Sequence, residues 1–141
     1  MVRFDLVTLD GTKFSQEVYE VILPTAEGYI AIFPDHSPLV SLAVPGVITV
    51  RQKPGDSDAH LKHFATNGGV IEVGSNTVKV LVDEADNEEE INEQEVQKAM
   101  EAARQLRAAA KDQISLDRAQ SLVDRQASRL KVAELRRHKR R

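Results

Sequence analysis

The last 67 residues of the chain contain no glycine, no proline and no aromatic residue. All seven glycines, all five prolines and all six aromatic residues lie at or before Gly74. Because glycine and proline mark turns, this division predicts a turn-rich first part and a second part of long, uninterrupted elements. The charge divides in the same way, since residues 1–87 carry a net charge of −6 and residues 118–141 carry +7. We therefore predict two domains, 1–87 and 88–141.

The composition is that of a folded, soluble chain. Hydrophobic residues make up 41% of it and charged residues 29%, which is typical of globular domains. No apolar run approaches the roughly 18 residues of a membrane-spanning helix, and no secretory signal is visible. The absence of cysteine excludes a disulfide scaffold, a thiolate zinc site and a cysteine nucleophile.

The first part predicts a small all-β domain. Short segments rich in Val, Ile, Leu and Thr are separated by turn signals such as Pro45-Gly46, and strands at this spacing favour a sandwich or barrel. In the last segment Val78, Val80 and Val82 alternate with other residues, so they are expected to face one way. The predicted strands are residues 2–9, 18–23, 28–33, 39–44, 47–52, 60–66, 69–73 and 77–83.

The second part predicts two helices that form a hairpin. Asn92, with Glu95 three residues later, resembles a capping box. Residues 111–113 interrupt the helical pattern, and both Asp112 and Ser115 are plausible caps for a second helix. Each helix is expected to have about 20 residues and to be roughly 30 Å long. Alanine dominates the apolar stripe, so docking should be only modestly stable, as suits a hairpin that can open. The predicted inner positions are Val96, Ala99, Ala103, Leu106, Ala110, Leu116, Ala119, Val123, Ala127, Leu130 and Ala133.

No motif predicts catalysis or metal binding. Gly68-Gly69, followed by Gly74, lacks the Gly-Lys-Ser/Thr ending of a phosphate-binding loop and is interpreted as turn glycines. His60 and His63 point to opposite faces if they lie in one strand, so they cannot share a metal ion. No pair of reactive side chains is placed for nucleophilic chemistry, and the chain is predicted not to be an enzyme.

The basic tail at residues 136–141 is typical either of a solvated chain end or of an arm that binds nucleic acid. No aromatic residue accompanies the tail to stack on bases, which weakens the second interpretation. A stand-alone adaptor or nucleic-acid-binding protein with a basic helical arm is the alternative function.

Five segments, taken in order, resemble the epsilon subunit of bacterial and chloroplast F-type ATP synthases. Residues 25–40 are similar to that family's glycine turn, strand and Pro-x-His-x-Pro-Leu segment, and 44–48 to its Pro-Gly hairpin. The other three segments resemble its Gly-Gly-x-x-Glu-Val strand at 68–73, the next strand at 77–82 and the end of the second helix at 129–134.

The resemblance implies an α+β fold, with an N-terminal ten-stranded β-sandwich followed by a C-terminal antiparallel hairpin of two helices. It implies a non-catalytic rotor subunit of the proton-translocating ATP synthase, which couples the gamma subunit to the c-ring. The helices would lie folded on the sandwich or extend into the catalytic alpha/beta hexamer, where they inhibit ATP hydrolysis. The expected location is the cytoplasmic face of the cell inner membrane, or the stromal face of the thylakoid in a plastid, reached only through the complex.

The resemblance also implies three groups of functional residues. Two turns are expected to contact the c-ring, and basic residues of the second helix to face an acidic segment of the beta subunit. Some family members bind regulatory ATP through a motif in which a cation is expected at the position of Glu95. We therefore predict weak ATP binding and no required cofactor. In a shifted alignment, Glu95 and Lys98 occupy the motif positions instead. No metal and no nucleic acid are expected. The c-ring contact comprises Glu27, Gly28, Tyr29, Asp35, His36 and Ser37; the inhibitory contact comprises Arg118, Arg125, Arg129 and Lys131; the degraded ATP site comprises Ile91, Asn92, Glu95, Arg125 and Arg129.

Overall fold

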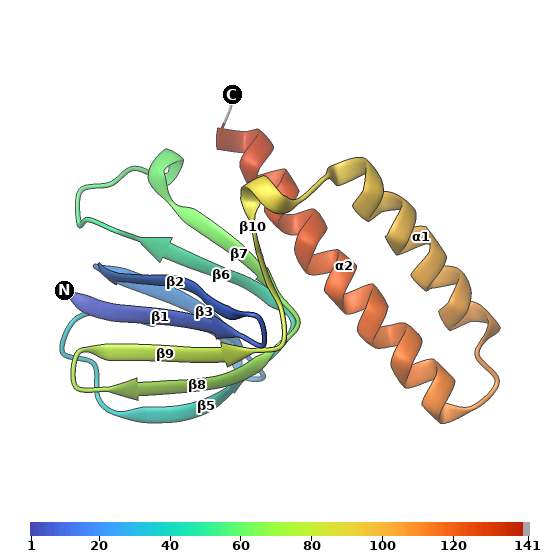
Figure 1. The fold of residues 1–141 in the computed structure, drawn as a ribbon, viewed down its shortest axis with the longest axis horizontal. Helices are drawn as coiled ribbons and strands as arrows, with labels where there is room; N and C mark the ends of the chain where they lie inside the picture. Colours follow the sequence, from blue (N-terminus) through green and yellow to red (C-terminus); the bar gives the residue numbers. More distant parts are fainter. Residues whose placement is uncertain (140–141) are drawn as a thin grey trace.

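Ten strands are followed by two long helices in the computed structural model, which describes residues 1–139 (Figure 1). This order confirms the predicted β-sandwich with a C-terminal helical hairpin. The strands are β1 Val2–Thr8, β2 Gly11–Val18, β3 Glu20–Thr25, β4 Gly28–Ile32, β5 Leu39–Ala43, β6 Gly46–Arg51, β7 Lys62–Thr66, β8 Gly69–Gly74, β9 Thr77–Val82 and β10 Ala85–Asn87. The helices are α1 Glu93–Ala109 and α2 Gln113–Lys139, with short 3-10 turns η1 Asp58–His60 and η2 Glu88–Glu90.

The strands form one sheet that folds over on itself into two layers (Figure 1). Its order is β10-β7-β6-β3-β5-β8-β9-β1-β2, with β4 paired to β3. Most neighbours are antiparallel, and β1 runs parallel to β9. Large apolar side chains such as Phe4, Leu6 and Ile71 are fully buried between the layers. In β9 the alternate valines are buried and the residues between them exposed, which confirms the predicted period of two.

Two strands were not predicted from the sequence, β2 and β10. Strand β2 lies at an edge of the sheet, and of its eight residues only Phe14 and Val18 are buried. An edge strand with so few buried positions carries a weak apolar pattern. Strand β10 has only three residues. The strand predicted at 60–66 begins two residues later, because η1 occupies the residues before it.

The helix boundaries follow their caps. The Asn92 side chain accepts a hydrogen bond from the backbone N of Glu95 (3.1 Å) at the start of α1. Asp112 accepts one from the backbone N of Ser115 (2.7 Å) at the start of α2, and this hydrogen bond lowers the pKa of the Asp112 carboxyl. The helices have 17 and 27 residues, so the predicted length of about 20 residues is close for α1 and too short for α2. Neither described helix is long and apolar enough to cross a membrane.

The hairpin docks through α2, which lies against β6 and β7, whereas α1 packs mainly on α2 (Figure 1). The predicted inner stripe is therefore only partly right. Leu106 and Leu116 are exposed at the tip of the hairpin, and Ala127 is exposed as well. One stripe cannot describe α2, because this helix buries one face against α1 and another against the sandwich. The buried residues are Val96, Met100 and Ala103 on α1 and Ala119, Val123, Gln126, Ser128, Val132 and Ala133 on α2.

Candidate functional site

Two arginines of α2, one helical turn apart, contact carboxylates of the sandwich. Arg125 Nη2 lies 2.7 Å from Glu84 Oε2, in the turn between β9 and β10. Arg129 Nε lies 3.1 Å from Asp86 Oδ2, in β10. The second pair is the more enclosed, since its side chains are 23% and 24% exposed. Neither contact has the alignment of a hydrogen bond, so both are ion pairs only.

The end of α2 binds the same region of the chain, the residues 84–93, which we call the acidic joint. Lys139 Nζ lies 2.6 Å from Glu88 Oε1, and Arg137 Nη2 lies 3.2 Å from Glu93 Oε1. Arg136 donates to the backbone carbonyls of Glu88 and Ile91. The basic side of α2 is thus folded back on the most acidic stretch of the sequence. The rest of the predicted basic tail, residues 140–141, lies outside the described residues.

The other two predicted inhibitory residues lie elsewhere on α2. Lys131 is exposed and lies 3.7 Å from Glu134 of the same helix. Arg118 is exposed near the tip of the hairpin and forms no ion pair with any residue that the structure describes. The structure therefore brings Arg125 and Arg129 to the sandwich and leaves the other two in solvent. The inhibitory role of all four stays a prediction.

The residues of the degraded ATP motif do not gather around one cavity. Ile91 is buried in an apolar cluster with Val132, and Asn92 caps α1. Both line a shallow cavity beside Arg136, whereas Arg125 lines a different cavity. Glu95 is exposed on α1. The Arg125 cavity is also lined by five carboxylates, those of Asp10, Asp83, Glu84, Asp86 and Glu90.

The two turns predicted to contact the c-ring lie at opposite ends of β4. The pairing of Thr25 with Gly28 and of Val21 with Ile32 places residues 27–29 at one end and 35–37 beyond the other. Strand β4 pairs only with β3 among the described strands, so its second edge is free. This free edge connects the two turns.

Tyr29 connects the first of these turns to the helical hairpin. Its side chain is 58% exposed, and its hydroxyl accepts a hydrogen bond from the backbone N of Val47 (3.2 Å). It lines one cavity together with Asp124 and Lys131 of α2. The predicted c-ring contact at this turn therefore lies directly beside the docked hairpin. At the other turn Asp35 adopts a positive φ of 66°, and its backbone N donates to Asn76 Oδ1 (2.8 Å).

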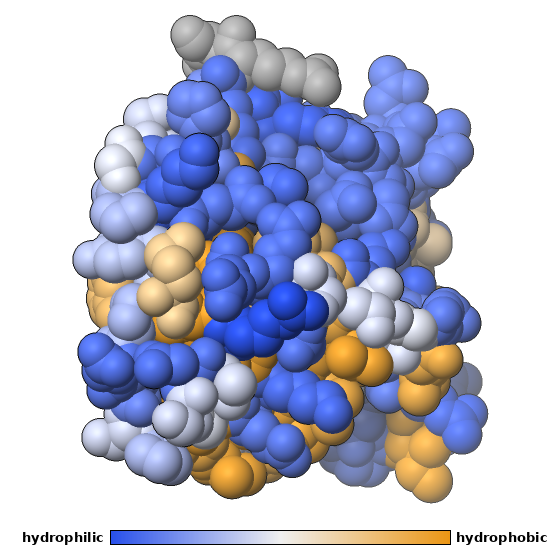
Figure 2. Space-filling view, turned by 60° about the vertical axis from the view of Figure 1, so that its left-hand side comes forward, coloured by the Kyte–Doolittle hydropathy of each residue, from blue (hydrophilic) through white to orange (hydrophobic). Residues whose placement is uncertain are grey.

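An exposed apolar patch on the outer face of β5, β8 and β9 was not singled out from the sequence. We define the patch as Val40, Leu42, Val70 and Leu81; the register pairs Leu42 with Val70 and Val70 with Leu81. Val40 and Leu42 are 77% and 67% exposed. Figure 2 shows hydrophobic surface mainly in the lower part of the molecule, where β5, β8 and the tip of the hairpin lie, below a mostly hydrophilic upper part. The outward positions in these alternating strands could have indicated it.

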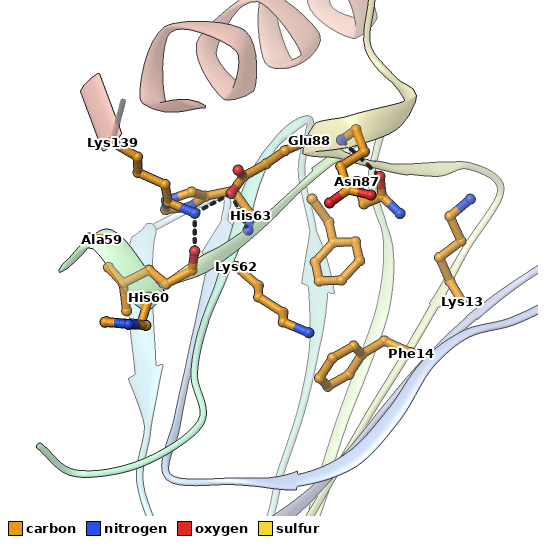
Figure 3. A pocket seen from close by; sticks show the side chains of 12 residues that line it. Lys13, Phe14, Ala59, His60, Lys62, His63, Asn87, Glu88 and Lys139 are labelled. Carbon is orange, nitrogen blue, oxygen red and sulfur yellow. Dashed lines mark hydrogen bonds and ion pairs between the residues drawn. The ribbon is translucent and has the colours of Figure 1, made fainter. Parts of the chain in front are cut away.

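A cavity of about 440 Å³ lies where the end of α2 meets η1, β7 and η2 (Figure 3). His63 lines it and is only 6% exposed, with Nδ1 3.0 Å from Thr49 Oγ1. Burial lowers the pKa of His63, and the positive charge of Lys139 lowers it further, while Glu88 and Asp58 act in the opposite direction. Among the described residues no cluster of three or more His, Asp or Glu side chains could hold a metal ion.

The sequence of the chain is similar to those of known proteins. The family model "ATP synthase, Delta/Epsilon chain, beta-sandwich domain" matches residues 1–88. The chain is 33% identical over 138 residues to the ATP synthase epsilon chain of Herpetosiphon aurantiacus, with 98% of each chain covered. It is 30% identical over 132 residues to that of Desulforamulus reducens, which covers 94% of this chain and 96% of the relative.

Two solved structures share the fold. One is a chain of the Euglena gracilis mitochondrial ATP synthase, in a structure of its OSCP, F1 and c-ring, with a TM-score of 0.77 and 22% identity. This match covers 90% of the present chain and 78% of the other. The second is a chain from the central stalk and c-ring of the Tetrahymena thermophila mitochondrial ATP synthase, with a TM-score of 0.59, 16% identity and coverage of 92% and 96%.

Proposed function

This chain belongs to the epsilon chains of ATP synthase, and we propose that it couples the gamma subunit to the c-ring in the central stalk and inhibits ATP hydrolysis through its C-terminal helices. Like the family, it is a non-catalytic subunit of the complex. Its association with the membrane, at the cytoplasmic face, is through the complex.

The exposed apolar patch is the main observation that supports a role in the central stalk. Four apolar side chains lie next to one another on one sheet face, and a contiguous group of this kind marks an interaction site. We assign this face to the gamma subunit, because it lies on a rigid part of the sandwich that the hairpin leaves uncovered. The likeness to a chain of a solved central stalk supports the assignment. The c-ring would then be met along β4, whose free edge joins the two turns named above.

The regulatory role is supported by the ion pairs of α2. A switch requires that each state makes contacts which the other lacks. In the folded state Arg125 and Arg129 contact Glu84 and Asp86. In the extended state an acidic segment of the beta subunit would replace these carboxylates. The apolar part of the docking surface is small on the sandwich side, since Val47 and Ala65 are the two strand residues in the cluster that includes Val132 and Ala133 of α2.

Regulation by ATP is expected to be weak in this chain. The cavity beside Arg125 is lined by five carboxylates, which repel the phosphates of a nucleotide. The ion pairs also occupy both arginines that the motif requires. We propose that the folded state needs no cofactor.

The alternative, a nucleic-acid-binding arm, is less well supported. Arg136, Arg137 and Lys139 of the tail all contact the acidic joint, which would have to be displaced before they could bind a phosphate backbone.

The substitution Leu42→Asp tests the stalk role. We expect it to lower the affinity for purified gamma subunit roughly tenfold or more, because the interface would bury an unpaired charge. The matched control is Leu9→Asp, at a leucine that is 83% exposed in the β1–β2 turn, outside the patch. Both variants should keep the parent melting temperature. Unchanged binding of Leu42→Asp to gamma, or recovery of RNA in place of gamma in a pull-down, would contradict the proposal.

A further inference from the structure

We propose that the contact between the C-terminal end of α2 and the sandwich, which we call the α2 seat, depends on pH. Protonation of His63 releases Lys139 from Glu88 and undocks this end of the helix. Any effect of this undocking on ATP hydrolysis rests on the proposed regulatory function. The contact itself lies within this chain and can be measured without the other subunits.

Three elements meet at the α2 seat: the end of α2, the turn η2 and the strand β7 (Figure 3). Lys139 is the last residue of α2, and its Nζ lies 2.6 Å from Glu88 Oε1 of η2. The same ammonium donates to the backbone carbonyl of Leu61. Both charged side chains are well enclosed, at 18% and 16% exposed. This is the most enclosed ion pair between α2 and the rest of the chain.

His63 lies next to this pair, on β7 (Figure 3). Its backbone N donates to Glu88 Oε1 (3.2 Å), which is the oxygen that Lys139 contacts. A single carboxylate oxygen therefore serves both the lysine and the strand that carries the histidine. A protonated ring would add a second positive charge near Lys139, whose own charge already lowers the pKa of His63, and Glu88 is the one carboxylate that Lys139 contacts.

The other charged groups around the cavity do not offer the ring a free carboxylate in contact. Asp58 of η1 lies 3.4 Å from Arg51 Nη2. Lys13 of β2 binds Glu90 of η2 (2.6 Å). Lys62 stands over the Phe14 ring at 5.6 Å and adds positive charge. The remaining titratable groups that line the cavity or flank it are His60 of η1, Glu89 of η2, and Arg136 and His138 of α2; Arg136 donates to the backbone carbonyl of Glu88.

The direction of the pH effect follows from the two states of His63. In the docked state burial and Lys139 hold its pKa below the usual value. Undocking removes Lys139 and exposes the ring, so its pKa returns toward about 6.5. The docked state binds fewer protons, and the contribution of His63 to docking is present above about pH 6.5 and lost as the pH falls through the docked pKa. The docking constant can fall by at most about tenfold per pH unit, the limit for one proton.

Energy transfer between two dyes on the full chain measures the docking. The chain has no cysteine, so Ser75→Cys in the β8–β9 turn and Glu134→Cys near the C-terminal end of α2 give two unique, exposed labelling positions. We expect transfer to decrease as the pH is lowered from 8 to 5 in the parent, and the decrease to be lost in His63→Asn. His60→Asn and His138→Asn are the matched controls, because both remove an exposed histidine near the same contact. These controls should keep the pH dependence.

Nuclear magnetic resonance titration of the His63 ring is the second measurement, since His63→Asn could itself weaken the fold. Lys139→Gln removes the neighbouring charge and leaves the ring in place. We expect the pKa of His63 to be higher in Lys139→Gln than in the parent. An equal pKa in the two chains, or an unchanged pH dependence of transfer in His63→Asn, would overturn the proposal.

Discussion

Replacing Asp86 and replacing Arg129 should change ATP hydrolysis in opposite directions, although the two residues form one ion pair. Asp86 lies in the sandwich and acts only when the hairpin is docked. Arg129 contacts Asp86 in the docked state and, in the proposed function, an acidic segment of the beta subunit in the extended state. Asp86→Asn therefore weakens one state, whereas Arg129→Gln weakens both.

The structure sets the magnitude of the Asp86 effect. The two atoms lie 3.1 Å apart, and the side chains are about a quarter exposed. A pair of this enclosure is at the upper end of the range for surface pairs, about 1 kcal/mol. This corresponds to a shift of about fivefold in the docking equilibrium toward the undocked hairpin. For Arg129→Gln the loss inside the hexamer should be larger than the loss on the sandwich, because screening by water is weaker there.

The assay is ATP hydrolysis by the complex reconstituted with each variant, read beside the energy transfer of the labelled chain. We expect Asp86→Asn to lower both transfer and hydrolysis, and Arg129→Gln to lower transfer but raise hydrolysis. Glu17→Gln is the matched control, because it removes one exposed carboxylate of β2 that forms no ion pair with any described residue. It should leave both readings unchanged. If Asp86→Asn and Arg129→Gln move hydrolysis in the same direction, the assignment of Arg129 to two alternative carboxylate partners is wrong.

Two further results are expected. The fragment 1–87 should be folded and should show a cooperative thermal transition by circular dichroism. It should restore proton-coupled ATP synthesis to the complex, with faster ATP hydrolysis than the full chain gives. An unfolded fragment would show that the sandwich depends on the hairpin. Calorimetry on the full chain should detect ATP binding no tighter than millimolar, because carboxylates surround Arg125; micromolar binding would show that another cation compensates.

The sequence by itself determined the order of the elements. The loss of glycine and proline after Gly74, taken with the change of charge near residue 87, separated a region of strands from a region of helices. The turn signals located eight of the ten strands. The interruption at 111–113 located the end of α1, and the caps, Asn92 for α1 and either Asp112 or Ser115 for α2, located the starts of both helices, because caps act through hydrogen bonds within three residues. These features are local, so a sequence records them directly.

Only the tertiary structure decided which side chains meet. Helical spacing places Arg125, Arg129 and Lys131 on α2, but the side that faces the sandwich depends on how the hairpin docks on β6 and β7. The same holds for the pairing of β4, which joins β3 alone among the described strands and keeps its second edge free. The seat of Lys139 over His63 joins residues 76 positions apart, and no local pattern records a contact across that distance. Such contacts are set by the packing of whole elements, where small docking energies choose among faces that the sequence leaves equivalent.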